Sequence, residues 1–383
     1  MTMGKWARLS LMGVTLLAGC KGFWDAPSSS SGSGSTTASS GVFYVANLEA
    51  GEIVGYYINS GVVTALSGSP YAVPAAPVAL AVSPSNSFLY ASTAAGIYVY
   101  SVASDGALTL ANSGSPISAD PAQSLQVDAT NSWLVEAVSG SANVYAIPLN
   151  PSTGGAASNT EKIAVLPNTA IQQVAISSDN LHVFVAMGAG GTAVIPFTSG
   201  NEDPFGAVGN IPVLNSAGAA LSVAVDPDDR LFYVGETAAT SGSNSGGLRV
   251  FDLSTLKEIA GSPFASQGLA PYSILPISTG DYVYVANRQV SGSSTGVIAG
   301  FSIASTNSVY SLTTLGSTFA AGTNPQSMVE DNTDTFVLVT DFGGNPDLKG
   351  YTFDTTNAGY LDAVISSATG TDPVEANAIA AQH

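Results

Sequence analysis

Polar and charged residues recur at one position of this 383-residue chain, the end of a Tyr/Val-rich phrase that returns along the sequence. Seven residues occupy that position: Asn47, Thr93, Val138, Met187, Glu236, Asn287 and Asp341. The third and fourth are apolar, whereas the last three and the first are polar, and Arg288 directly follows Asn287. A carboxylate can move a proton and a guanidinium can hold an anion. Groups of these kinds converging beside an apolar wall predict a small-molecule site.

The charge balance limits what the chain can bind. Acidic residues number 27 against nine lysines and arginines, which gives a formal net charge of −18. Nucleic-acid binding depends on basic side chains that neutralise phosphates, so we expect no nucleic-acid partner. Hydrophobic residues make up 45% of the chain and occur in strand-like bursts, which indicates a folded protein rather than a disordered one.

The N-terminal segment has the features of a bacterial lipoprotein leader. Residues 1–19 begin with basic residues and continue in an apolar run too short to span a bilayer. The run ends in Leu17-Ala18-Gly19-Cys20, the lipobox pattern, and this cysteine is the only one in the chain. We therefore expect a signal peptide over residues 1–19, a lipid on Cys20 and a Ser/Gly-rich tether over residues 20–40. Such a protein would be held in the cell envelope, at the outer membrane of a Gram-negative host or otherwise at the extracellular face of the cell membrane.

A repeat of strand, turn and strand organises the rest of the chain. It is complete from Pro77 to Tyr90, where alternating strands flank a Ser-Pro-Ser-Asn turn. Units begin near residues 41, 77, 121, 170, 219, 271 and 325. The first unit lacks its first strand, and residues 372–383 look like a first strand without the rest. Six whole units and two complementary fractions predict an all-β fold. This fold is a seven-bladed β-propeller of four-stranded antiparallel blades, closed by the C-terminal strand pairing into the N-terminal blade.

Several motifs that suggest other chemistry fit the repeat instead. The acidic segment 226–229 occupies the turn of its unit and lacks the spaced bidentate acid of a calcium loop. Residues 292–296 match Gly-x-Ser-x-Gly but join two predicted strands, whereas a nucleophile elbow needs a strand-to-helix turn. With His182 and His383 as the only histidines, neither a catalytic triad nor a zinc site is expected.

The phrase Tyr-Val-Ala-Asn at 44–47 and again at 284–287 resembles the repeats of lactonase-like seven-bladed propellers and of the related YVTN-repeat surface proteins. The lactonase-like group includes enzymes of the 6-phosphogluconolactonase type and the carboxymuconate lactonizing enzyme. The resemblance implies a histidine and an arginine on first strands, a glutamate ending a second strand and an arginine in an Asn-Arg phrase. Glu236 and Arg288 match the last two, whereas residues 172–175 and 219–222 hold neither of the first two.

The resemblance also implies roles for the polar residues. Glu236 would be the general base, and Arg288 would hold a substrate carboxylate and stabilise an oxyanion. Asn47, Asn287 and Asp341 would bind and orient the ligand. Analogy with other propeller lactonases suggests a second version, in which Glu236, Asp341, Asn287 and Asn47 are oxygen ligands of Ca²⁺ or Mg²⁺. In the first version, in which Glu236 is the base and Arg288 holds the carboxylate, we expect no metal or other cofactor.

Three functions follow from these observations. The first is an envelope-anchored binding module whose propeller top face takes a small molecule or an envelope protein. The second is a lactone hydrolase that uses Glu236 and Arg288 on a repurposed substrate. The third is a structural protein of the surface-layer type. The position of the Glu236 and Arg288 side chains separates the first two, because hydrolysis requires both in one pocket.

Overall fold

The computed structural model describes residues 41–383, apart from 139, 159, 169 and 367–371. The predicted signal peptide, Cys20 and the tether lie outside the described residues. Within the described part of the chain, no helix is long and apolar enough to cross a membrane.

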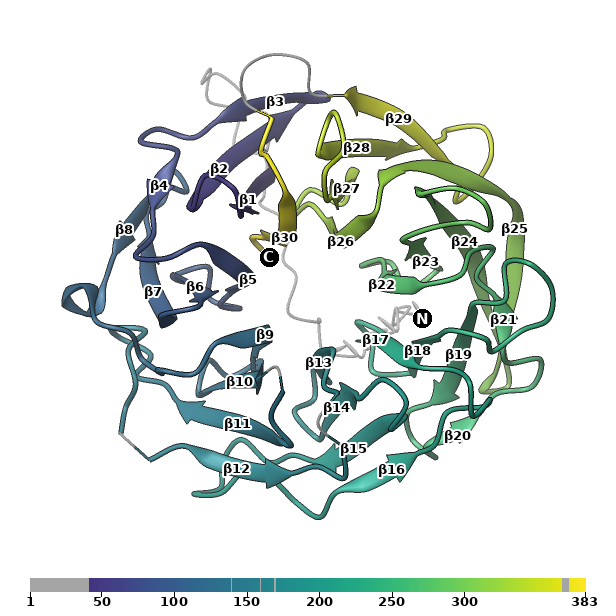
Figure 1. Cartoon of the computed structure of the whole chain (residues 1–383), viewed down its shortest axis with the longest axis horizontal. Coiled ribbons are helices and arrows are strands. Elements are labelled where there is room, and N and C mark those ends of the chain that lie inside the picture. The colour runs from purple at the N-terminus through teal and green to yellow at the C-terminus, as the bar shows by residue number, and fades with distance from the viewer. Residues whose placement is uncertain (1–40, 139, 159, 169, 367–371) are drawn as a thin grey trace, which may run out of the picture. The chain divides into compact units, whose positions relative to one another are not determined.

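Seven antiparallel sheets are arranged around a central axis, and each is one blade (Figure 1). Blade 1 contains β1 (Gly41–Asn47), β2 (Glu52–Asn59), β3 (Val62–Ala65), the short β4 (Tyr71–Ala72) and β30 (Ala376–Ala381). Blade 2 contains β5 (Pro77–Val82), β6 (Phe88–Thr93), β7 (Gly96–Val102) and β8 (Leu108–Leu110), followed by the 3₁₀ turn η1 (Asn112–Gly114). Blade 3 contains β9 (Ala122–Val127), β10 (Trp133–Val138), β11 (Asn143–Pro148) and β12 (Lys162–Val165).

The remaining four blades are ordered like blades 2 and 3, with the first strand innermost and the later strands farther from the axis (Figure 1). Blade 4 contains β13 (Gln173–Ile176), β14 (His182–Ala186), β15 (Thr192–Pro196) and β16 (Gly209–Ile211). Blade 5 contains β17 (Ala220–Val225), β18 (Leu231–Glu236), β19 (Gly247–Asp252), β20 (Lys257–Glu258) and β21 (Phe264–Ala265). Blade 6 contains β22 (Pro271–Pro276), β23 (Tyr282–Asn287), β24 (Thr295–Thr306) and β25 (Val309–Thr323). Blade 7 contains β26 (Pro325–Glu330), β27 (Phe336–Asp341), β28 (Leu348–Phe353) and β29 (Leu361–Ser366).

The ring is closed by strands from the two ends of the described chain. Strand β30 pairs antiparallel with β1, so that Val45 lies opposite Ile379 and Tyr44 opposite Ala380. Figure 1 shows β30 as the innermost strand of blade 1, in the place that the first strand takes in every other blade. The predicted seven-bladed architecture and its closure are therefore confirmed.

Hydrophobic residues pack between neighbouring blades rather than in one central core. One face of each sheet contacts the preceding blade and the other face contacts the next, which explains why the strands are apolar on both faces. Between blades 4 and 5, for example, the Phe232 ring stacks on Phe184 at 4.2 Å and on Phe251 at 4.6 Å between centroids. The hydrophobic core is therefore distributed around the ring, in clusters that neighbouring blades share.

The turn between the first and second strands is alike in five blades. One residue of each turn takes the left-handed conformation with φ between 54° and 57°: Asn86, Asn131, Asn180, Asp229 and Asp334. Asn and Asp tolerate this conformation better than most residues.

Three of these side chains also link the blades. Asn131 accepts a hydrogen bond from the Ser85 N–H, Asn180 from the Ala129 N–H and Asp229 from the Ser178 N–H. In the acidic turn at 226–229, Asp229 thus links two blades, as expected of a structural turn.

Candidate functional site

A cavity of about 680 Å³ lies on the axis of the propeller. Its lining comes from the innermost strands of all seven blades: residues 78–80, 121–126, 172–176, 221, 223–225, 272, 326–329 and 377–379. Among the described residues that line the cavity there is no Asp, Glu or His, so the lining offers neither a carboxylate nor an imidazole. The polar groups that it offers are mainly side-chain amides and hydroxyls, from residues such as Gln123, Gln172, Gln326 and Tyr272.

Glutamines on the innermost strands join neighbouring blades and face the cavity. The Gln126 side-chain oxygen accepts the Ile176 N–H at 2.8 Å, and that of Gln173 accepts the Val223 N–H at 3.0 Å. Each glutamine thus uses its acceptor for the adjacent blade. Among the described residues, the NH₂ groups of these two side chains have no acceptor, which leaves hydrogen-bond donors for a ligand.

Arg288 contacts two residues that line this cavity and is not itself one of the lining residues. Its guanidinium stacks over the Tyr272 ring and donates a hydrogen bond to the side-chain oxygen of Gln326, and both of these partners line the cavity. Burial lowers the pKa of Arg288, but an arginine remains charged at physiological pH. In the described part of the chain Arg288 forms no ion pair, and its Nε atom has no hydrogen-bond acceptor.

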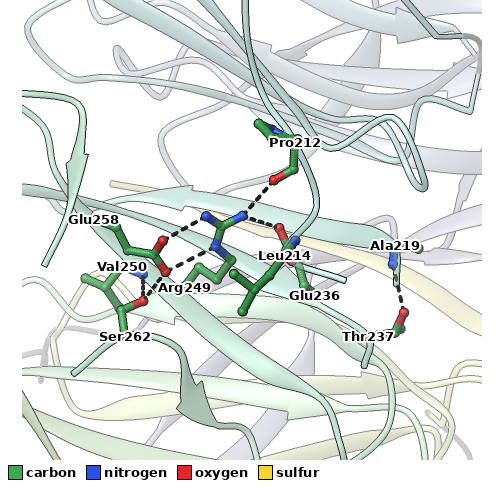
Figure 2. Close-up of polar contacts among 9 residues, drawn as sticks. All are labelled: Pro212, Leu214, Ala219, Glu236, Thr237, Arg249, Val250, Glu258 and Ser262. Carbon is green, nitrogen blue, oxygen red and sulfur yellow. Dashed lines mark hydrogen bonds and ion pairs between the residues drawn. The ribbon is translucent and has the colours of Figure 1, made fainter. Parts of the chain in front are cut away.

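Glu236 is engaged in a different network (Figure 2). Its carboxylate receives a hydrogen bond from Arg249 Nη1 at 2.8 Å and another from the Leu214 N–H at 3.0 Å. The same guanidinium bonds to both carboxylate oxygens of Glu258, at 3.1 and 2.8 Å, and to the Pro212 carbonyl at 2.9 Å. Only 1% of the Glu236 surface is exposed, so this carboxylate is fully occupied within blade 5 and the loop that precedes it.

Among the described residues, no hydrogen bond or ion pair joins Glu236 to Arg288. The partners of Glu236 are Arg249 and Leu214, whereas those of Arg288 are Tyr272 and Gln326, and the described contacts of the two have no residue in common. The catalytic roles predicted for this pair remain predictions. What the geometry shows is one arginine against two residues of the cavity lining and one glutamate bonded to a different arginine.

The other three predicted site residues are also engaged, either within their own blade or by the preceding blade and the connection that follows it. Asn287 is fully buried, with hydrogen bonds to the Ser266 hydroxyl at 2.7 Å and the Ser266 carbonyl at 2.6 Å. Asn47 accepts the Ala50 N–H at 3.2 Å and so closes the turn after β1. Asp341 accepts the Gly322 N–H at 3.2 Å and lies 3.7 Å from Lys349 Nζ. Burial raises the pKa of Asp341 to about 7.

Two charged residues escaped the sequence reasoning although each carries a visible signal. Arg249 is a single arginine within an apolar third strand, and such a residue needs a buried acid as its partner. Glu136 stands in the same way within the apolar strand β10. Burial, with Glu161 and Asp120 nearby, raises the pKa of Glu136 to about 8.

Comparison with known proteins identifies the family. No curated protein matches the sequence, but residues 42–344 match the family described as lactonase, 7-bladed beta-propeller. The fold is similar to that of a putative 6-phosphogluconolactonase from Bacteroides fragilis, with a TM-score of 0.69, 15% identity, and coverage of 91% of this chain and 100% of that chain. It is also similar to a periplasmic gluconolactonase of Pseudomonas aeruginosa, with a TM-score of 0.68, 15% identity, and coverage of 90% and 99%. The chain belongs to the lactonase family of seven-bladed β-propellers.

Proposed function

We propose that this protein is an envelope lipoprotein whose propeller binds a small polyhydroxylated carboxylate, or the corresponding lactone, in its axial cavity. The observation that carries the proposal is Arg288, a half-buried cation against the cavity-lining residues Tyr272 and Gln326, with no acidic partner among the described residues. A cation in that position is stabilised by an anion from outside the chain.

The rest of the lining suits the hydroxyl groups of such a ligand. Amide groups of Gln126 and Gln173 and the Tyr272 side chain surround the same space, and the innermost strands hold them in place. Similar structures include proteins described as gluconolactonases, whose substrates combine hydroxyl groups with a lactone. We infer that sugar acids and sugar lactones are the ligand class.

Binding is favoured over hydrolysis by the state of Glu236. A general base needs a free carboxylate within reach of the water that it activates, whereas the Glu236 carboxylate is bonded to Arg249 and to the Leu214 N–H. Lactone hydrolysis is the second candidate, because the family comprises lactonases. A continuous pH-indicator assay on sugar lactones separates the two: turnover that disappears in the double variant Glu236→Gln, Arg288→Ala would establish the hydrolase.

Gluconate is expected to bind the wild-type protein, and Arg288→Met is expected to weaken that binding about 10- to 100-fold. The estimate corresponds to the loss of one charge-assisted hydrogen bond to the carboxylate. Isothermal titration calorimetry with gluconate, glucono-δ-lactone and neutral glucose measures the effect. The neutral sugar should lose little affinity in the variant.

Lys257→Met is the matched control for this experiment. Lys257 is an exposed cation on the outer strand β20, also without an ion pair among the described residues, and lies outside the cavity lining. Its removal changes the net charge by the same amount and should leave the affinity for gluconate unaltered. Equal affinity of wild type and Arg288→Met would contradict the proposed anion site.

The lipid anchor has a separate test. Cys20→Ala is expected to move the protein from the membrane fraction to the soluble fraction of a bacterial host, because Cys20 is the only residue that can carry the thioether-linked lipid. Mass spectrometry of the N-terminal peptide measures the added lipid directly. An unmodified Cys20 in the membrane-bound wild type would refute the anchor without affecting the ligand site.

A further inference from the structure

Three carboxylates meet between blades 2 and 3, far in sequence from Arg288. One carboxylate oxygen each from Asp120, Glu136 and Glu161 lies within 4.8 Å of the other two. The three come from separate segments, namely the connection that enters β9, the middle of β10 and the residue before β12. Their proximity is thus a product of the fold and not of a local acidic run.

Glu136 is the buried member of this cluster. None of its surface is exposed, and it shares the face of β10 with Leu134, which packs against blade 2. One of its oxygens accepts a hydrogen bond from the Ser118 hydroxyl at 3.3 Å, whereas Oε2 has no partner among the described residues. A buried carboxylate oxygen without a partner is strongly disfavoured unless a further group satisfies it.

The cations in the described part of the chain do not supply that group. Within the described residues no lysine or arginine forms an ion pair with any of the three carboxylates. Lys162, which directly follows Glu161, pairs with Glu202 instead, at 3.6 Å. Three acids therefore converge without a compensating positive charge from the described residues.

A cavity that can hold water also adjoins the cluster on the side of Ser118 and Glu161. A cavity of about 230 Å³ is lined by Ser118 and Glu161 of this cluster, together with Pro116, Ile117, Ala119, Ile147 and Ser158. Asp120 and Glu161 are half-buried, so solvent has access to the cluster from that side.

We propose that Asp120, Glu136 and Glu161, with the Ser118 hydroxyl, bind one Ca²⁺ ion between blades 2 and 3. All of these donors are oxygens, which suit a hard cation and not zinc or copper. Calcium takes six to eight oxygen ligands in flexible geometry, whereas Mg²⁺ requires a near-ideal octahedron. Because its ligands come from the connection after blade 2 and from blade 3, the ion links these segments and contributes to stability independently of the axial cavity.

The test is equilibrium dialysis of the full chain, freed of metal with EDTA, against radioactive Ca²⁺. We expect one ion per wild-type chain, and an affinity lower by at least about tenfold in Glu136→Gln, which removes one charged ligand. The melting temperature of the wild type should rise with Ca²⁺ and that of this variant should not, since an ion that binds only the folded state stabilises it. Mg²⁺ at the same concentration should have a smaller effect.

Two further variants keep the proposal falsifiable. Glu161→Gln changes a half-buried ligand and provides the same test if the buried substitution prevents folding. Asp228→Asn removes a carboxylate whose side chain is 60% exposed, in the acidic turn of blade 5, and should retain calcium like the wild type. Absence of bound Ca²⁺ on the wild type, or equal binding by Glu136→Gln, would overturn the site. A higher melting temperature of Glu136→Gln in EDTA, with no metal response of the wild type, would instead assign the cluster to a shared proton.

Discussion

Replacing Arg249 with methionine is expected to lower the free energy of unfolding by about 3–5 kcal/mol, the usual cost of breaking a buried ion pair from one side. The Arg249 side chain is 7% exposed and contacts the carboxylates of Glu236 and Glu258, both at 2.8 Å. Without the guanidinium, Glu236 remains buried beside an apolar side chain and its charge has no compensation. Urea denaturation followed by circular dichroism measures the difference.

Two controls give this result its meaning. Lys162→Met removes an ion pair whose acid, Glu202, is 97% exposed, and should cost less than about 1 kcal/mol. Adding Glu236→Gln to the Arg249→Met variant should recover part of the loss, because the buried group is then neutral. If Arg249→Met unfolds at the same urea concentration as Lys162→Met, the network contributes little and Glu236 is free to take another role.

Asp341→Asn is expected to stabilise the protein above pH 7, by roughly 2–4 kcal/mol, and to have almost no effect near pH 3. Burial raises the pKa of Asp341 from its ordinary value of 3.8 to about 7, so the folded state binds this proton more tightly than the unfolded state. The free energy of unfolding of the wild type therefore falls as the pH rises from 3.8 to about 7. The asparagine variant has no carboxyl to ionise at this position, so its stability does not fall for this reason. The magnitude follows from the cost of ionising a buried carboxyl, about 1.4 kcal/mol for each tenfold change in proton affinity.

Denaturation curves at several pH values between 3 and 8.5 measure this difference, because all other ionisable groups are shared by the two proteins. Asp354→Asn is the control of opposite sign. Hydrogen bonds from Asn357 and Thr356 lower the pKa of this exposed carboxyl, so its replacement should not stabilise the protein at high pH. If the difference in the free energy of unfolding between Asp341→Asn and the wild type stays constant with pH, then Asp341 is already neutral or its charge is already compensated.

The fold could be predicted because its determinants are local and repeated. The apolar strands and the Asn or Asp of each turn recur in every unit that begins near residue 77, 121 or 170, so one unit explains the others. The left-handed conformation of Asn86, Asn131 and Asn180 shows why these turns use that residue type. Closure could also be predicted, because the strand missing at one end is present at the other.

The directions of the side chains could not be predicted in the same way. Asn287 and Arg288 are adjacent, yet Asn287 bonds to Ser266 in the connection between blades 5 and 6, whereas Arg288 contacts Tyr272 and Gln326 of the cavity lining. Successive side chains along a strand point to opposite faces of the sheet. A register shift of one residue exchanges the two faces. The sequence locates the polar sector but not which member of the pair faces a ligand.

The partner of Glu236 was missed for a related reason. Glu236 lies opposite Gly247 in the sheet, and Arg249 is its diagonal neighbour on the adjacent strand. This contact depends on the register across a ten-residue loop, which the repeat does not determine. The glutamine contacts around the cavity depend on register between blades and were missed likewise.

The pairing of β30 with β1 has a consequence for how the protein is made. A ribosome produces β1 among the first strands of the propeller and β30 last, so blade 1 lacks its innermost strand until synthesis has passed residue 376. A prematurely terminated product would leave β1 with an unpaired edge, the kind of surface that aggregates and that chaperones and proteases act upon. Pairing of β30 with β1 thus distinguishes chains that extend through β30 from chains that stop before it.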